Sequence, residues 1–150
     1  MTIASPLRYP GGKSAMAGLL GQIRDLNGLG NRVIAEPFAG GAGASLTLLY
    51  REETHEIYIN DADTLIYDFW WTVVNRSQPF ITLLKKTRVN ITEWYRQREI
   101  FKKRKQASQI KRGFSTFFLN RCNRSGVIKN GGPIGGIEQT GEWKLAARFN

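Results

Sequence analysis

The spacing of apolar residues predicts a strand–helix–strand segment near the start of the chain. Residues 5–13 hold two prolines and two glycines, which predicts a loop, and residues 14–26 repeat apolar side chains at helical spacing, which predicts an amphipathic helix. A short apolar run at 32–35 and an alternating run at 56–61 predict two strands, joined by a helix over about 42–52. Two strands joined by one helix form a βαβ unit, so we expect a parallel sheet with its ligand at the carboxyl ends of the strands.

The rest of the chain predicts helices followed by an irregular segment. Residues 65–75 form an aromatic-rich helix, 79–105 indicate one or two further helices, and 114–119 begin another apolar element. Six glycines and one proline between 123 and 141 favour a loop or a hairpin. The candidate core positions within 79–105 are Ile81, Leu84, Trp94 and Phe101.

Charge separates the chain into two parts. The net charge is +10; residues 1–66 hold 5 Lys/Arg and 7 Asp/Glu, whereas residues 67–150 hold 17 Lys/Arg and 5 Asp/Glu. We therefore expect a small-molecule domain over 1–66 and a basic, mainly helical domain over 67–150 that binds a polyanion. The alternative is a solvated basic surface that only keeps the protein soluble.

Composition also narrows the partners and cofactors. No apolar run approaches about 18 residues and no secretory signal pattern is present, so we expect a soluble, cytoplasmic protein with no membrane partner. One cysteine, Cys122, excludes an internal disulfide framework, and one histidine, His55, leaves too few soft ligands for zinc. We predict no metal site, and any cofactor is expected to be organic.

The stretch 36–46 is a small-residue loop between the first predicted strand and a helix, which lets a backbone approach a nucleotide-like cofactor closely. Asp61 follows Gly41 by 20 residues, at the end of the second strand. A carboxylate there suits ribose hydroxyls, with capping of the next helix as the alternative. Glu36 suits a cationic amino or sulfonium group, with a surface salt bridge as the alternative.

Two other regions carry candidate chemistry. Near the N-terminus, Lys13 suits a carboxylate or phosphate and Tyr9 suits a flat ring, although a turn with a solvated lysine is the simpler interpretation. Between Lys85 and Lys129 the chain holds 14 Lys/Arg and two acids, and the run 102–105 is best explained as a solvated helix face. The turn-rich segment after the last apolar element carries Arg and Asn, which read base edges, and long basic side chains that hold phosphates.

Four motifs in this order resemble the Dam-like DNA adenine methyltransferases. They are RYPGGK at 8–13, AEPFAGGAGASL at 35–46, IYIND at 57–61 and FFLNRCNRSGV at 117–127. The resemblance covers essentially the whole chain and implies methyl transfer from S-adenosylmethionine to N6 of adenine in double-stranded DNA. It implies an α/β fold, with a Rossmann-like methyltransferase sheet that is incomplete in this chain and a mainly helical target-recognition region with a loop or hairpin. It also implies a bacterial or phage-encoded protein.

The resemblance assigns residues to two sites. The implied cofactor-binding residues are Tyr9, Lys13, Glu36, Phe38, Gly40 and Asp61. The implied DNA-binding residues are Arg8, Asn120, Arg121, Asn123, Arg124, Ser125 and Lys129. Lys13 is expected near the methionine carboxylate of the cofactor, and Asp61 at its ribose. Arg124 and Ser125 stand where the family has an aromatic–Asn pair, so a GATC target is not implied.

The motif with which this family holds the target adenine, Asp/Asn-Pro-Pro-Tyr/Phe, does not occur in the sequence. The five prolines are Pro6, Pro10, Pro37, Pro79 and Pro133, and no two are adjacent. We therefore expect a fragment without catalytic residues, inactive alone and prone to self-association through an exposed sheet edge.

Two other functions stay open at this stage. One is a non-catalytic DNA-binding protein derived from a methyltransferase. The other is a nucleotide-dependent dehydrogenase, which shares the βαβ arrangement but leaves RYPGGK and the basic half of the chain unexplained. The sequence does not distinguish restriction–modification from replication or repair marking.

Overall fold

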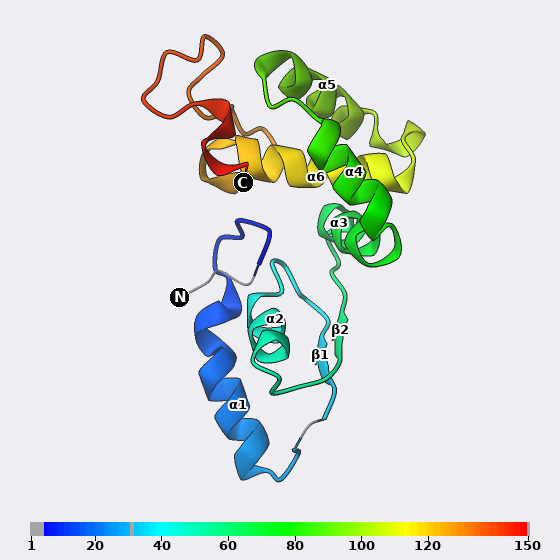
Figure 1. Ribbon diagram of the computed structural model, residues 1–150, viewed down its shortest axis with the longest axis vertical. Coiled ribbons are helices and arrows are strands. Elements are labelled where there is room, and N and C mark those ends of the chain that lie inside the picture. Colours follow the sequence, from blue (N-terminus) through cyan, green and yellow to red (C-terminus); the bar gives the residue numbers. More distant parts are fainter. Residues whose placement is uncertain (1–4, 31, 150) are drawn as a thin grey trace. The chain divides into compact units, whose positions relative to one another are not determined.

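A computed structural model describes residues 5–30 and 32–149 of the chain. The chain divides between Ala62 and Asp63 into two units (Figure 1). Most of the regular structure is helical, and the described residues contain one two-stranded sheet, which lies in the N-terminal unit. The fold is therefore mixed and helix-rich.

The N-terminal unit contains the predicted parallel strand pair and the helix that joins its strands. Its elements are the 3-10 helix η1 (Lys13–Met16), α1 (Ala17–Leu26), β1 (Ile34–Glu36), α2 (Gly43–Tyr50) and β2 (Ile57–Ile59). The two strands pair in parallel, with Ile34 opposite Ile57 and Glu36 opposite Ile59. Both strands therefore end at the same edge of the sheet, and the residues that follow them are brought together there.

The predicted amphipathic helix is present, but its apolar face is not the core of this unit. Leu19 and Ile23 on α1 are 53% and 46% exposed, whereas the small residues Ala17 and Gly21 are buried. Gly21 faces α2 and the residues after it, because a Cβ atom on it would lie 2.7 Å from Glu53 Oε2 and 3.8 Å from a methyl group of Leu48. The spacing of apolar residues predicted the helix correctly. The buried side of α1, however, is the side on which the small residues Ala17 and Gly21 lie.

The C-terminal unit is helical. Its elements are α3 (Thr64–Asn75), α4 (Ser77–Lys86), α5 (Ile91–Lys102), η2 (Arg104–Gln106), α6 (Gln109–Cys122), η3 (Arg124–Gly126) and η4 (Leu145–Arg148). Side-chain caps explain two of the helix starts. Asp63 accepts a hydrogen bond from the Leu65 amide at 2.9 Å, and Asn90 accepts one from the Glu93 amide at 2.8 Å. The predicted helical stretch 79–105 is thus interrupted before Asn90.

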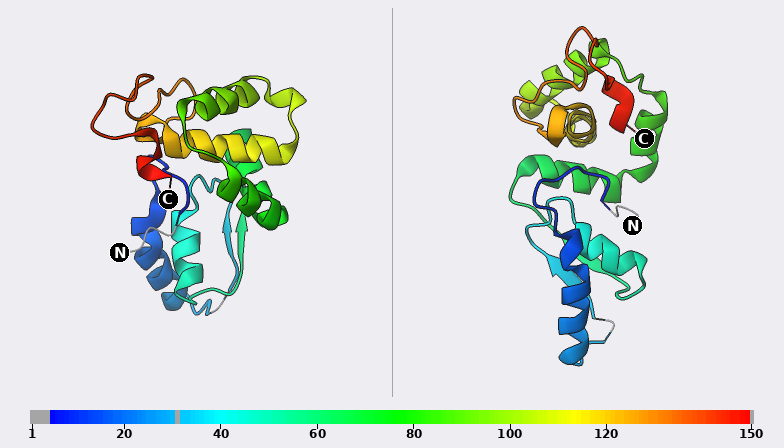
Figure 2. Two further views of the ribbon diagram at one scale, coloured as in Figure 1. Left: turned by 45° about the horizontal axis from the view of Figure 1, so that its top comes forward. Right: turned by 90° about the vertical axis from the view of Figure 1, so that its left-hand side faces the viewer.

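Helix α6 is the centre of this unit, because its residues from Gly113 to Asn120 are all buried. Its Phe117 ring stacks on Phe69 of α3 with centroids 5.9 Å apart. A Cβ atom on Gly113 would lie 2.5 Å from the Asp68 carbonyl oxygen, so glycine lets α3 and α6 approach closely. In both views of Figure 2 the C-terminal turn η4 (red) lies beside the end of α6 (orange), where Phe149 contacts Phe117 and Phe118.

One sequence prediction for this unit needs correction. Ile81, a predicted core residue, is 38% exposed, because Phe80 occupies the buried face of α4. Trp94 is buried as predicted. The segment 123–141 contains turns, the 3-10 helix η3 and one isolated antiparallel bridge between Asn123 and Pro133. Of the two predicted forms, a loop or a hairpin, the described chain has the loop.

Candidate functional site

The glycine loop between β1 and α2 is tied to the end of β2. The Ala39 amide donates to the Asn60 carbonyl oxygen at 2.9 Å, and the Gly40 amide donates to Asp61 Oδ2 at 2.7 Å. Gly40 has a φ of +52°, and Ala42 is left-handed with a φ of +49°. The turn therefore aims backbone N–H groups toward the carboxyl edge of the sheet, where one of them meets a carboxylate.

Lys13 and Glu36 form an ion pair beside this loop. Lys13 Nζ lies 2.9 Å from Glu36 Oε1 and donates to the Phe38 carbonyl oxygen at 2.7 Å. Ser45, in the first turn of α2, donates a short hydrogen bond to Glu36 Oε2. The Glu36 side chain is 11% exposed and the Lys13 side chain 39%. Glu36 therefore makes a salt bridge, as its alternative role predicted, but only the lysine end of the pair lies at the surface. The pair places a cation and an anion next to each other at the end of β1.

The two aromatic residues assigned to the pocket differ in their surroundings. The Tyr9 ring packs on Gly40, because a Cβ atom there would lie 2.7 Å from Tyr9 Cε1. Tyr9 is 42% exposed and Phe38 is 70% exposed. Both side chains are therefore partly open to solvent: Phe38 is part of the glycine loop, and Tyr9 packs against the loop at Gly40.

Asp61 does not serve as the helix cap that was its alternative role. The residue that caps α3 is Asp63, which accepts the hydrogen bond from Leu65. Asp61 instead bonds to Gly40 and is half-buried after the end of β2. Its carboxylate belongs to the glycine loop.

In the C-terminal unit, two of the asparagines assigned to DNA lie in the interior. Asn120 and Asn123 are each 1% exposed. Asn120 Nδ2 donates to the Gly126 carbonyl oxygen at 3.0 Å, and Asn123 Nδ2 donates to the Val127 carbonyl oxygen at 2.7 Å. Asn123 Oδ1 also accepts a hydrogen bond from Trp94 Nε1 at 2.7 Å. Both amides therefore fix the shape of the turn that follows α6.

The remaining residues assigned to DNA lie nearer the surface. Arg124, Ser125 and Lys129 are exposed on the turn after α6, and Ser125 is left-handed with a φ of +54°. Lys129 Nζ lies 3.5 Å from the Asp63 carboxylate. Arg121 is half-buried in α6, and Arg8 is half-buried in the N-terminal unit. Buried amides thus support a turn that exposes basic side chains.

A comparison with protein families decides the family. The model for D12 class N6 adenine-specific DNA methyltransferases matches residues 9–133. The chain belongs to this family. A search of curated proteins found no match. The matched range begins at Tyr9 and ends at Pro133, so this D12-class chain carries family sequence in both of its units.

Membership in the D12 class indicates the type of reaction, methylation of adenine at N6, and the type of substrate, DNA. Within the described ranges, no three His, Cys, Asp or Glu side chains gather as a possible metal site. No helix of the described chain has the length and apolar character to cross a membrane.

Sequence reasoning missed two contributors to these sites. Ser45 was not singled out, although a hydroxyl in the first helical turn after an acidic strand end is a signal that could have found it. Asp68 was not singled out either, yet it is buried and paired with Arg104 and Arg112. Its partners lie 36 and 44 residues away along the chain, a separation that no local pattern indicates.

Proposed function

We propose that the N-terminal unit binds S-adenosylmethionine at the carboxyl edge of a Rossmann-like strand–helix–strand unit. The observation that carries this proposal is the hydrogen bond from the Gly40 amide to Asp61 at 2.7 Å, which joins the glycine loop to the acid after β2. A glycine loop and an acid in this arrangement suit the ribose of a nucleotide-like cofactor. The cofactor supplies the methyl group to be transferred.

The side chains around the loop fit the charges of this cofactor. S-adenosylmethionine carries a carboxylate and an ammonium group on its amino-acid end, and Lys13 and Glu36 offer one partner of the opposite charge to each. In the free protein these two side chains pair with each other at 2.9 Å. We expect each of them to exchange its partner for a group of the cofactor, so that no buried charge is left unpaired. Tyr9 and Phe38 offer exposed rings beside the loop.

We propose that the C-terminal unit binds the double-stranded DNA substrate. From Asp63 onward the chain holds 17 Lys/Arg and 6 Asp/Glu, an excess that favours phosphate contacts. Arg124, Ser125 and Lys129 are exposed and can meet DNA directly, and Arg121 lies half-buried near the end of α6. We also propose Arg8, in the N-terminal unit, as a DNA contact of that unit. Asn120 and Asn123 would act by positioning the turn that carries these contacts, because their amides bond within the protein.

Transfer to adenine N6 requires that the base leave the helical stack and that acceptor groups orient its amino group. The 150 residues hold no Asp/Asn-Pro-Pro-Tyr/Phe motif for this task. We propose that these residues bind cofactor and DNA but do not transfer the methyl group by themselves. The test is incubation with methyl-tritiated S-adenosylmethionine and duplex DNA of mixed sequence, beside an active adenine methyltransferase as assay control. We expect no label in the DNA, and label on adenine N6 would contradict the proposal.

A second candidate is a non-catalytic DNA-binding protein, which the missing motif also favours. It predicts salt-dependent DNA association without affinity for the cofactor.

We further propose self-association through the strand pair, since both strands of a two-stranded sheet are edge strands. Light scattering on the eluting peak of a gel-filtration column tests this, and a monomer at every concentration would contradict it.

A further inference from the structure

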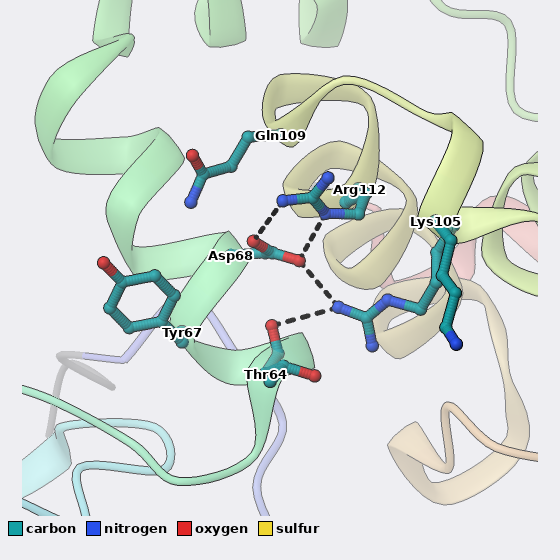
Figure 3. Close-up of a pocket in the computed structure, with 7 residues that line it drawn as sticks. Thr64, Tyr67, Asp68, Lys105, Gln109 and Arg112 are labelled. Atoms are coloured by element: carbon teal, nitrogen blue, oxygen red, sulfur yellow. Dashed lines mark hydrogen bonds and ion pairs between the residues drawn. The ribbon is translucent and has the colours of Figure 1, made fainter.

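A pocket of about 470 Å³ lies in the C-terminal unit, and none of its lining residues belongs to the turn after α6. It is lined by residues from α3, η2 and α6, and Figure 3 shows their side chains. Three of the lining side chains are cations, which are Arg104, Lys105 and Arg112, and one is an anion, Asp68. The pocket therefore carries an excess of two positive charges.

Asp68 holds both arginines in place. Its side chain is 5% exposed; Arg112 Nε donates to Oδ2 at 2.7 Å and Arg112 Nη2 to Oδ1 at 3.1 Å, while Arg104 Nη2 donates to Oδ2 at 2.6 Å. Burial alone would raise the pKa of Asp68, but the hydrogen bonds from Arg112 and Arg104 outweigh it and hold that pKa below its usual range. The carboxylate is therefore charged and fixes the two guanidinium groups.

The backbone fixes these groups further. Arg112 Nη1 donates to the Ala107 carbonyl oxygen at 2.8 Å, and Arg104 Nη2 donates to the Thr64 carbonyl oxygen at 3.1 Å. The Arg104 and Arg112 side chains keep 24% and 26% of their surface exposed. They are thus partly open to a ligand although their positions are set, so a ligand would meet groups that need little further ordering.

A purely structural role explains only part of this cluster. A buried carboxylate that ties α3 to α6 needs one bidentate arginine, and Arg112 supplies it. Arg104 uses only Nη2 for its hydrogen bonds within the described chain, which leaves the N–H groups on Nε and Nη1 to a ligand. Lys105 is exposed and makes no ion pair among the described residues. Arg104 Nε, Arg104 Nη1 and the Lys105 ammonium group are therefore hydrogen-bond donors that the contacts between α3, η2 and α6 do not use.

The neutral lining side chains suit the same ligand. Thr64, Tyr67 and Gln109 line the pocket and offer hydroxyl and amide donors (Figure 3). A phosphate group presents acceptor oxygens only, and a planar guanidinium matches it bidentately, as it matches a carboxylate. The donor set therefore favours an oxyanion, and phosphate is the oxyanion that a DNA partner presents.

We propose that this pocket binds a phosphate group of the nucleic-acid backbone, as a contact separate from the turn that follows α6. The inference rests on the proposed function in one respect, namely that the C-terminal unit binds DNA. A phosphate contact fixes the position of the protein on the duplex without reading its sequence. The pocket would anchor the unit while the exposed turn meets the bases.

The test is the salt dependence of DNA affinity of the full chain, measured by fluorescence anisotropy between 50 and 200 mM salt on two duplexes of different sequence. Lys105→Gln removes one cation without touching the Asp68 network, and Lys111→Gln is the matched control, because Lys111 is exposed on α6 and does not line the pocket. We expect Lys105→Gln to lower the log–log salt slope by about 1 on both duplexes and Lys111→Gln to leave it unchanged.

The proposal that the pocket binds phosphate would be overturned if Lys105→Gln left the salt slope unchanged. It would also be overturned if Lys111→Gln lowered the slope by as much as Lys105→Gln. A second measurement separates this proposal from the function on which it rests. Titration with inorganic pyrophosphate, followed by the ¹⁵N–¹H signal of Arg104 Nε, is expected to shift that signal in the wild type and less in Lys105→Gln. If the wild type binds no DNA but this shift occurs, the proposed DNA partner fails and the phosphate site stands. If the signal does not move, the site itself fails.

Discussion

At the scale of single residues, the buried Asn123 shows how one amide can set the shape of a loop. Its Oδ1 accepts from Trp94 Nε1 and its Nδ2 donates to the Val127 carbonyl oxygen, each at 2.7 Å. Both partners would lose a hydrogen bond if the amide were removed. The turn that exposes Arg124 and Ser125 therefore depends on a residue that is itself 1% exposed.

Asn123→Ala is expected to lower the free energy of unfolding by about 2–3 kcal/mol, because it leaves a buried indole N–H and a carbonyl oxygen unsatisfied. Urea unfolding followed by tryptophan fluorescence measures the change. Asn75→Ala is the matched control, since the exposed Asn75 amide bonds only to the Trp71 carbonyl oxygen of its own helix. A loss no larger than that of the control would show that the Asn123 bonds do not hold the loop.

The buried thiol of Cys122 gives a second prediction at this scale, which concerns protein stability at alkaline pH. Burial raises the pKa of its thiol to about 12 from the ordinary 9.0. Between these two values the unfolded chain loses the thiol proton and the folded chain keeps it, so Cys122 makes stability fall as the pH rises above 9.0. We expect the stability difference between wild type and Cys122→Ala to change from pH 9 upward, by at most about 1.4 kcal/mol per pH unit. A difference that is constant with pH would contradict the burial argument.

At the scale of elements, the sequence predicted what local pattern determines. The order of strand, glycine loop, helix and strand followed from short apolar runs and small residues, and the parallel pairing of β1 with β2 confirmed it. The side of α1 that is buried could not be predicted, because small residues such as Gly21 and not the apolar face meet α2. The full length of α6 was missed, since its buried run has no alternation that marks one face.

The candidate sites were predictable to a similar extent. Glu36 and Asp61 stood out because each lies at or just after the end of a strand, where an acid has a chemical use. Whether they meet the loop depends on tertiary contacts, such as the bond from Gly40 to Asp61. The pairing of Asp68 with two distant arginines could not be predicted, because the side chains come from elements that are adjacent only in the folded unit.

The glycine loop gives the prediction for this scale. Gly40→Ala would place a Cβ atom 2.7 Å from Tyr9 Cε1 at a residue with a φ of +52°, so the Tyr9 ring must move and the backbone is strained. We expect loss of S-adenosylhomocysteine binding and a lower melting temperature. Gly18→Ala is the matched control, because its Cβ atom would meet nothing within 4 Å, and it should stabilise α1 by up to about 1 kcal/mol. If both variants kept the affinity of the wild type, the loop would not be the cofactor site.

At the scale of the whole molecule, the two units differ in the chemistry they offer. Up to Ala62 the chain holds 5 Lys/Arg and 6 Asp/Glu, and Glu36, Asp61 and the glycine loop lie at one edge of a parallel strand pair. From Asp63 onward 17 Lys/Arg face 6 Asp/Glu, on a helical unit with a basic pocket and a basic turn. The family match covers residues 9–133 and so includes sequence from both units.

The central claim is that the glycine loop and Asp61 bind S-adenosylmethionine, and calorimetric titration of the full chain tests it most directly. Wild type, Asp61→Ala and Asp63→Ala are each titrated with S-adenosylhomocysteine and with NAD. Asp63 is the control, because this nearby acid caps α3. The account predicts one S-adenosylhomocysteine per chain, no binding of NAD, a loss of about tenfold or more in Asp61→Ala, and unchanged affinity in Asp63→Ala. Equal binding of NAD, or no binding of S-adenosylhomocysteine to the folded wild type, would contradict it.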